Sequence, residues 1–179
     1  MEKIVFETKA KNKEGIPFLK IKEVERWFNY CERLGIDSVA FILYNKNKKF
    51  NPYGLIREIK PPFYEREHHK FKAITAFGGS LDKNISLKDI VKEEVKEEAG
   101  YIVQTNNIAY LGKVIVSTQM NQYCHLFIVN ISNSRYCGQQ LEENEAGEVV
   151  WLSEDEILNL NDWKSITIIA KAKFKKLIN

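Results

Sequence analysis

The stretch covering residues 78–101 limits the fold of this chain more than any other segment. After two glycines and a polar loop, its pattern predicts a helix from Leu87 to Ala99. Ser86 and Asp89 form a capping-box pattern at the start of the helix, and Gly100 suits the left-handed residue that ends one. The apolar residues recur at helical spacing and predict one buried face, made of Leu87, Ile90, Val91, Val95 and Ala99.

Three glutamates lie beside that apolar face. Glu94, Glu97 and Glu98 are three and four residues apart, so their carboxylates project from one side of the helix. Like charges at this spacing repel each other by ~0.2–0.5 kcal/mol per pair in an exposed helix. Carboxylate oxygens on a rigid element suit Mg²⁺ or Mn²⁺, and the preceding glycines let the backbone approach them closely. An acidic helix face is more often simply solvated, so the spacing alone leaves both interpretations open.

The remaining segments predict an N-terminal extension followed by one α+β domain. A helix is expected at Ile21–Leu34, where apolar residues recur at helical spacing and Gly35 follows. We therefore expect residues 1–36 to form a strand-helix extension packed on a domain of residues 37–179. Strands are predicted at Asp37–Tyr44, Tyr53–Ile59, Phe71–Phe77, Ile108–Ser117, Tyr123–Ile131 and Glu148–Leu152, and further helices after Ser153 and at Trp163–Leu177.

Composition excludes several classes of protein. The chain has 179 residues and a formal net charge of +3, which gives no support for long nucleic acid or a membrane surface as partner. No apolar run is long enough to span a membrane, and the first residues lack the apolar core of a signal peptide. A cytoplasmic protein is therefore expected.

The glutamate helix resembles the Nudix box, a motif that reads G-x5-E-x7-R-E-U-x-E-E-x-G-U, with U apolar or aromatic. The matching residues are Gly79, Glu94, Val95, Glu97, Glu98, Gly100 and Tyr101. The likeness extends from about Val39 to Lys171, and the loop Glu143–Glu145 before a strand is similar to the ADP-ribose pyrophosphatase branch. The resemblance implies a Nudix-type α/β/α sandwich with a mixed β-sheet.

The resemblance also implies a metal site on the helix. The carbonyl of Gly78 and the carboxylates of Glu94 and Glu98 would bind Mg²⁺ or Mn²⁺. Glu97 would bind or orient a further ion and so take part in catalysis. The motif assigns no substrate-binding residue.

A second part of the implied site lies in the acidic loop. In the ADP-ribose pyrophosphatase pattern, Glu143 would be the catalytic base and Glu145 a further metal ligand. A solvated acidic loop that includes Glu142 is the alternative interpretation of these residues.

Two positions of the box depart from the family pattern. Ile85 and Glu93 stand where the family has a glutamate and an arginine that support each other. We hypothesise that Ile85, just before the Ser86 cap, packs on the first turn and replaces this missing ion pair. A proline that members of the branch often carry past the box is absent from Val114–Gln119, which leaves the substrate open.

The implied function is metal-dependent hydrolysis of the pyrophosphate bond in a nucleoside diphosphate linked to another moiety, such as the nucleotide sugar ADP-ribose. Two alternatives stay open: a non-catalytic Nudix-fold module that binds a nucleotide, and a Nudix hydrolase of (deoxy)nucleoside triphosphates or capped RNA. The implied partners are a small nucleotide substrate and, because members of the branch are often dimers, a second copy of the chain held by the extension.

Overall fold

The computed structural model describes residues 2–25, 28–35, 37–60, 65–69, 72–141 and 146–178. Its strands are β1 (Glu2–Glu7), β2 (Leu19–Val24), β3 (Phe28–Arg33), β4 (Ser38–Tyr44), β5 (Tyr53–Glu58), β6 (Ala73–Thr75), β7 (Phe77–Ser80), β8 (Tyr101–Ile102), β9 (Ile108–Ser117), β10 (Met120–Asn130), β11 (Arg135–Tyr136) and β12 (Gly147–Leu152). Its helices are α2 (Leu87–Ala99), α3 (Glu154–Leu158) and α4 (Trp163–Phe174), with a 3-10 turn, η1 (Thr105–Asn107).

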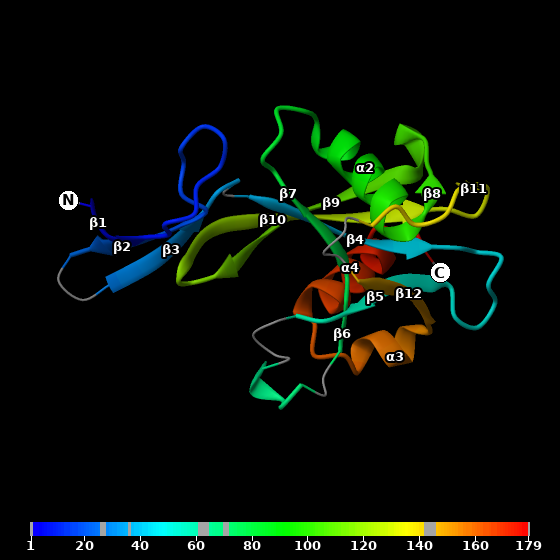
Figure 1. Ribbon diagram of the computed structural model, residues 1–179. Coiled ribbons are helices and arrows are strands. Elements are labelled where there is room, and N and C mark those ends of the chain that lie inside the picture. Colours follow the sequence, from blue (N-terminus) through cyan, green and yellow to red (C-terminus); the bar gives the residue numbers. More distant parts are fainter. Residues whose placement is uncertain are drawn as a thin grey trace.

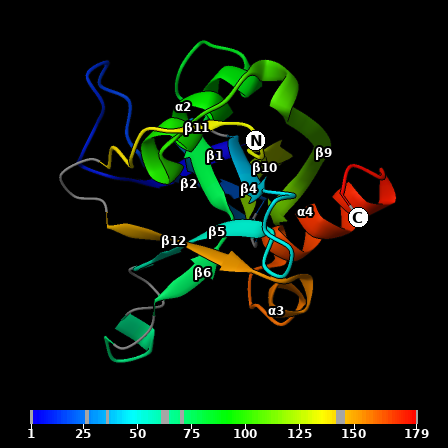
Figure 2. The ribbon, with the colours of Figure 1, turned by 90° about the vertical axis from the view of Figure 1, so that its right-hand side faces the viewer.

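Ten of the described strands form one mixed sheet. Seven of them follow the order β1-β2-β3-β10-β4-β5-β12, while β6 pairs with β5, β7 with β4 and β9 with β10. β10 runs parallel to β4 and β3, and the other pairs are antiparallel. Helix α2 lies on one face of this sheet and α3 and α4 lie on the other (Figure 1). The turned view shows the sheet curling between these helices (Figure 2).

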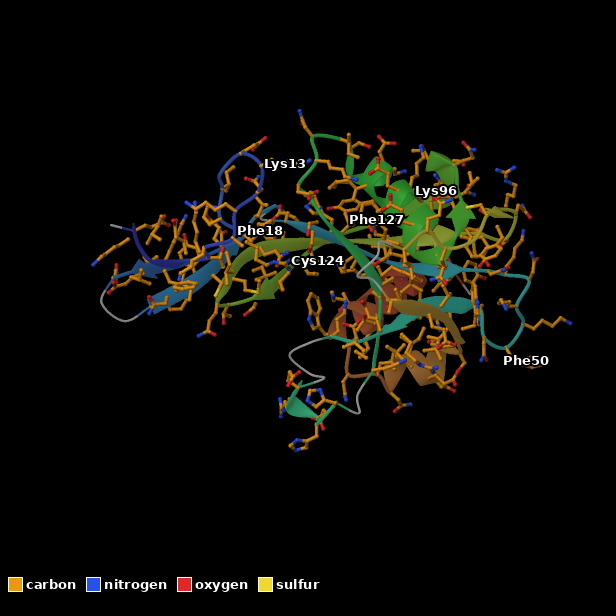
Figure 3. The ribbon with its side chains drawn as sticks, viewed as in Figure 1. Lys13, Phe18, Phe50, Lys96, Cys124 and Phe127 are labelled. Atoms are coloured by element: carbon orange, nitrogen blue, oxygen red, sulfur yellow. The ribbon has the colours of Figure 1, made fainter. Side chains whose placement is uncertain are left out.

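Strand β4 is buried on both faces and separates two hydrophobic cores. Its residues alternate, so that Val39, Phe41 and Leu43 pack toward α2 while Ala40 and Ile42 pack toward α4. Phe127 of β10 belongs to the core under α2, between the sheet and the helix (Figure 3). Two helical layers around a mixed sheet confirm the expected α+β class and the α/β/α sandwich.

The N-terminal segment differs from the prediction. The helix expected at Ile21–Leu34 is wrong, because β2 and β3 pair antiparallel from Leu19 opposite Arg33 to Val24 opposite Phe28. A few apolar residues in a short segment satisfy a helical period and a strand period alike, and pairing with neighbouring strands then decides between them. The extension is therefore a meander of β1, β2 and β3, without the helix expected for residues 1–36.

This meander continues the main sheet. β3 meets β10 through the pair Cys31 and Met120, and β1 forms the outer end of the strand order. In Figure 1 the meander reaches away from the helical layers toward the N-terminus.

The other predicted elements lie within a few residues of their expected bounds. The bounds of α2 coincide with the prediction, whereas α4 ends at Phe174 and the strand predicted at Tyr123–Ile131 begins earlier, at Met120. The long strand expected before the glycines is divided in two at Ala76, since β6 pairs with β5 and β7 with β4. None of the helices in the described part of the chain is long and apolar enough to cross a membrane.

Candidate active site

The ends and the buried face of α2 fix how its glutamates point. The Asp89 N–H donates to Ser86 Oγ (3.2 Å), and the Ser86 hydroxyl donates to the Asp89 carboxylate (2.7 Å). Gly100 ends the helix with a φ of 74°, in the left-handed region. Ile90, Val91, Val95 and Ala99 are buried against the sheet, as predicted. Because this apolar face fixes the rotation of the helix about its axis, it also fixes the side from which the glutamates project.

A cavity of about 320 Å³ opens between β7, the loop of residues 81–86 and α2. It is lined by Gly78, Gly79 and Ser80 of the strand, by Asp82 and Lys83 of the loop, and by Ile90, Glu94, Glu97 and Glu98 of the helix. Four residues predicted for the metal site, Gly78, Glu94, Glu97 and Glu98, thus meet in one cavity.

Gly79 allows the strand and the helix to come this close. A Cβ atom at position 79 would lie 2.1 Å from Oε1 of Glu94 and 2.6 Å from its Cδ. Any side chain at this position would therefore displace the Glu94 carboxylate. The close approach gives a physical reason for glycine at this position of the motif.

The donor atoms of the cavity suit a hard divalent cation. Glu94 and Glu98 are half-buried, Glu97 is exposed, and the Oε2 atom of Glu98 is fully screened from solvent. Among the residues that the structure describes, no three His, Cys, Asp or Glu side chains converge closely enough to hold an ion by themselves. Mg²⁺ is commonly held by one or two carboxylates, with water and substrate phosphates completing its octahedron. The residues present fit that kind of open site and do not form a closed cage.

The segment leading to the acidic loop is fastened to the C-terminal end of α2. The side-chain Nε2 of Gln139 donates to the carbonyl of Glu98 (2.6 Å) and to that of Gly147 (3.3 Å). The backbone N–H of Gln140 donates to the carbonyl of Glu97 (2.8 Å). The bonds to Glu97 and Glu98 satisfy carbonyls that a helix end leaves without partners in its own turn.

The predicted base Glu143 and the predicted ligand Glu145 lie outside the described residues, as does Glu142. The structure places their neighbours in the chain: Gln140 on one side is bonded to Glu97, and Gly147 on the other begins β12. The described residues on the two sides, Gln140 and Gly147, are thus both joined to the end of α2, directly or through Gln139.

Glu93 is paired, although Ile85 stands where the family has a charged partner. Lys83 Nζ donates to Glu93 Oε2 over 2.6 Å, and the two side chains are 57% and 44% exposed. The hydrogen bond to Glu93 is the main cause that raises the pKa of Lys83, with further contributions from the charges of Glu93, Glu97 and Asp82. The loop and the helix are thus joined by a cation on the loop and an anion on the helix.

This pair corrects the hypothesis about Ile85. The pair between positions 85 and 93 is missing, as the sequence indicates, but Lys83 joins the loop to Glu93 with the charges reversed, so an apolar contact of Ile85 is not needed to replace it. Ile85 itself is 42% exposed and lines a second cavity of about 430 Å³ with Glu93, Ile102 and Val103, among others.

Sequence reasoning missed two residues of the site, Lys83 and Gln139. Both contact α2 from irregular segments, so no periodic pattern marks them. One signal could have indicated Lys83. It is a basic residue in the loop before the helix, where Glu93 has no basic partner at position 85.

Comparison with known proteins bears on the fold. No protein-family model matches the chain, and no curated protein matches it in sequence. A solved structure entitled "Crystal structure of ADP compounds hydrolase" matches it with a TM-score of 0.64 at 13% identity, covering 97% of this chain and 93% of that one. The match includes nearly the whole chain, and it supports the Nudix-type mixed-sheet fold that the sequence predicted.

Proposed function

We propose that this protein is a metal-dependent hydrolase that cleaves the pyrophosphate bond of a nucleoside diphosphate linked to another moiety. The observation that carries the proposal is the cavity in which Glu94, Glu97 and Glu98 face the backbone of Gly78 and Gly79. The fold that the chain shares with a hydrolase of ADP compounds supports the same class of substrate. A nucleotide sugar such as ADP-ribose belongs to that class.

In the proposed site, the helix and the strand before it would hold the metal, and the acidic loop would supply the base. The carbonyl of Gly78 and the carboxylates of Glu94 and Glu98 would hold Mg²⁺ or Mn²⁺, with Glu97 beside them. Such an ion, when bound, neutralises the charge of the diphosphate and lowers the pKa of a coordinated water.

Glu143 would accept a proton from the attacking water, and Glu145 would add a ligand. Water then adds to one phosphorus as the bridging bond breaks, which gives a nucleoside monophosphate and a phosphorylated remainder.

The decisive experiment is a substrate panel with Mg²⁺ and Mn²⁺, read out as release of nucleoside monophosphate. The panel contains ADP-ribose, other nucleotide sugars, nucleoside triphosphates and capped RNA. We expect turnover of the diphosphate-linked compounds, and we expect Glu94→Gln and Glu98→Gln to lose it by orders of magnitude. Glu14→Gln, an exposed change in the N-terminal segment, is the matched control.

Two outcomes would contradict the proposal. Near-full activity in both helix variants would exclude the metal site. Nucleotide binding without turnover of any compound would favour the binding module instead.

The loop glutamates have a separate test. Glu143→Gln should lower turnover by ~10²–10⁴-fold, as loss of a general base does, with metal affinity unchanged. Glu145→Gln should instead raise the metal concentration needed for activity. If Glu142→Gln alone damages turnover, the base lies one residue earlier.

We also propose that two copies of the chain associate through β1. Its apolar residues Ile4, Val5 and Phe6 are each about half exposed, and β1 ends the strand order. An exposed strand edge with apolar side chains is a favourable surface for pairing with another chain.

A further inference from the structure

We propose that Glu93 is a positioning residue that holds the ammonium group of Lys83 away from the metal-binding glutamates, and that Lys83 competes with divalent metal once it is released. This inference rests on the proposed function, because it concerns the metal affinity of the same cavity.

Lys83 stands beside the proposed metal ligands. It lines the same cavity as Glu94, Glu97 and Glu98, and its ammonium group is bonded to Glu93 over 2.6 Å. A cation therefore stands at the edge of the carboxylates that would hold the metal.

Glu93 is a neighbour of one of these glutamates on α2. It lies four residues before Glu97 on α2, so the two carboxylates are neighbours on one side of the helix, one turn apart. Lys83 already lies within the electrostatic influence of Glu97 as well as of Glu93. A change of side-chain torsions is enough to carry the ammonium group from one carboxylate to the other, because a lysine side chain is long and flexible.

Removing one partner of the Lys83–Glu93 pair should affect a bound cation differently from removing the other. Without the charge of Glu93, the ammonium group is left with Glu97, whose charge already acts on it, and beside Glu97 it would oppose a bound cation. Without Lys83, no such competition arises. The effect of a change at position 93 should therefore depend on whether Lys83 is present.

The test measures Mn²⁺ affinity by electron paramagnetic resonance, which needs no turnover. We expect Glu93→Gln to weaken Mn²⁺ binding by about three- to tenfold, the size that one cation at this range produces. We expect Lys83→Gln to bind Mn²⁺ as tightly as the wild type or more tightly. In the double variant Lys83→Gln with Glu93→Gln, most of the loss should disappear.

The neighbouring pair on the same helix provides the matched control. Asp89 and Lys92 form an ion pair of 3.4 Å beside the second cavity, and Asp89→Asn removes the same charge from α2 as Glu93→Gln does. Asparagine keeps the backbone N–H that bonds Ser86 Oγ and an amide oxygen that can accept the Ser86 hydroxyl, so the helix cap is retained. We expect this variant to bind Mn²⁺ nearly as the wild type does. Circular dichroism and thermal unfolding of every variant establish that each is folded.

Three results would overturn the inference. Glu93→Gln could leave Mn²⁺ affinity unchanged, or weaken it equally with and without Lys83, or weaken it no more than Asp89→Asn does. Absence of Mn²⁺ binding by the wild type is a distinct result, because it removes the proposed metal site and the inference together.

Discussion

The backbone of Gly79 lies directly against the carboxylate of Glu94, so closely that a Cβ atom at position 79 would stand 2.1 Å from Oε1. The obstructing atoms belong to the end of a flexible side chain and not to the backbone. The carboxylate can therefore move aside, so the fold can accept a larger residue at position 79, but the Glu94 carboxylate is then displaced from the proposed metal site.

We predict that Gly79→Ala lowers activity strongly and stability only slightly. Gly79 has no positive φ, so alanine fits its backbone, and forcing Glu94 off its rotamer costs about 0.5–1.5 kcal/mol. Displacing a ligand carboxylate by about 1 Å should lower turnover roughly 10–100-fold and weaken Mn²⁺ binding. Denaturant unfolding and steady-state kinetics measure the two effects side by side.

Gly78→Ala is the matched control for that change. Its Cβ would meet the carbonyl of Val39 at 3.1 Å and no atom of Glu94, and it retains the carbonyl proposed as a ligand. A similar loss of activity in both variants would show that the Glu94 contact is not the cause.

A second prediction concerns Gln139, whose side chain joins the end of α2 to the start of β12. Gln139→Met keeps the length of the side chain but removes its bonds to the carbonyls of Glu98 and Gly147. Stability should fall by about 1 kcal/mol. If these bonds position the acidic loop, kcat should fall and the Mn²⁺ concentration needed for activity should rise, because Glu143 and Glu145 lie in the same loop.

Gln140→Ala is the control, since Gln140 contacts Glu97 through its backbone N–H, which alanine retains. Equal kinetics for Gln139→Met and the wild type would show that the loop does not depend on this anchor.

The sequence predicts α2 far better than it predicts the N-terminal segment. The bounds of α2 were predictable because the Ser86 cap, the Gly100 terminator and a five-residue apolar face all indicate the same helix. The segment of residues 21–34 offered apolar spacing and a following Gly35 but no capping pattern at its start, and the structure shows it as two strands. Pairing with β1 and with each other is a long-range effect that local spacing does not contain.

The break between β6 and β7 has a similar cause. The sequence predicts one continuous strand leading to the glycines, whereas the chain moves from β5 to β4 at Ala76. The Ala76 N–H donates to the buried carboxylate of Asp162 (3.0 Å), which also caps α4 through Ser165. This contact joins residues far apart in the chain, so no local pattern could predict it.

The pH dependence of stability provides a third prediction. Burial, followed by the charges of Glu154 and Tyr44, raises the pKa of Tyr53 to about 12 from a usual value of 10.0. Between these values the unfolded chain loses the phenol proton while the folded protein keeps it, so the unfolded state binds fewer protons and stability falls as pH rises. The contribution is complete below pH 10 and decreases by about 2 kcal/mol toward pH 12.

Tyr53→Phe isolates this effect from the titration of other groups. The difference in unfolding free energy between wild type and variant, measured by denaturant titration from pH 8 upward, should be constant below pH ~10 and should decrease above it. A difference that does not vary with pH would show that the Tyr53 phenol titrates normally in the folded protein.

The last prediction tests the proposed association through β1. Phe6 is 52% exposed on that strand, and a lysine there places a charge on the apolar surface and on a strand edge, where charges discourage pairing. Phe6→Lys should therefore convert a dimer to a monomer in sedimentation velocity. Phe50, 86% exposed in the hairpin loop between β4 and β5, provides the matched control (Figure 3). Phe50→Lys adds the same charge far from β1 and should leave the dimer intact. A wild-type protein that sediments as a monomer at tens of micromolar, or a dimer that survives Phe6→Lys, would rule out this interface.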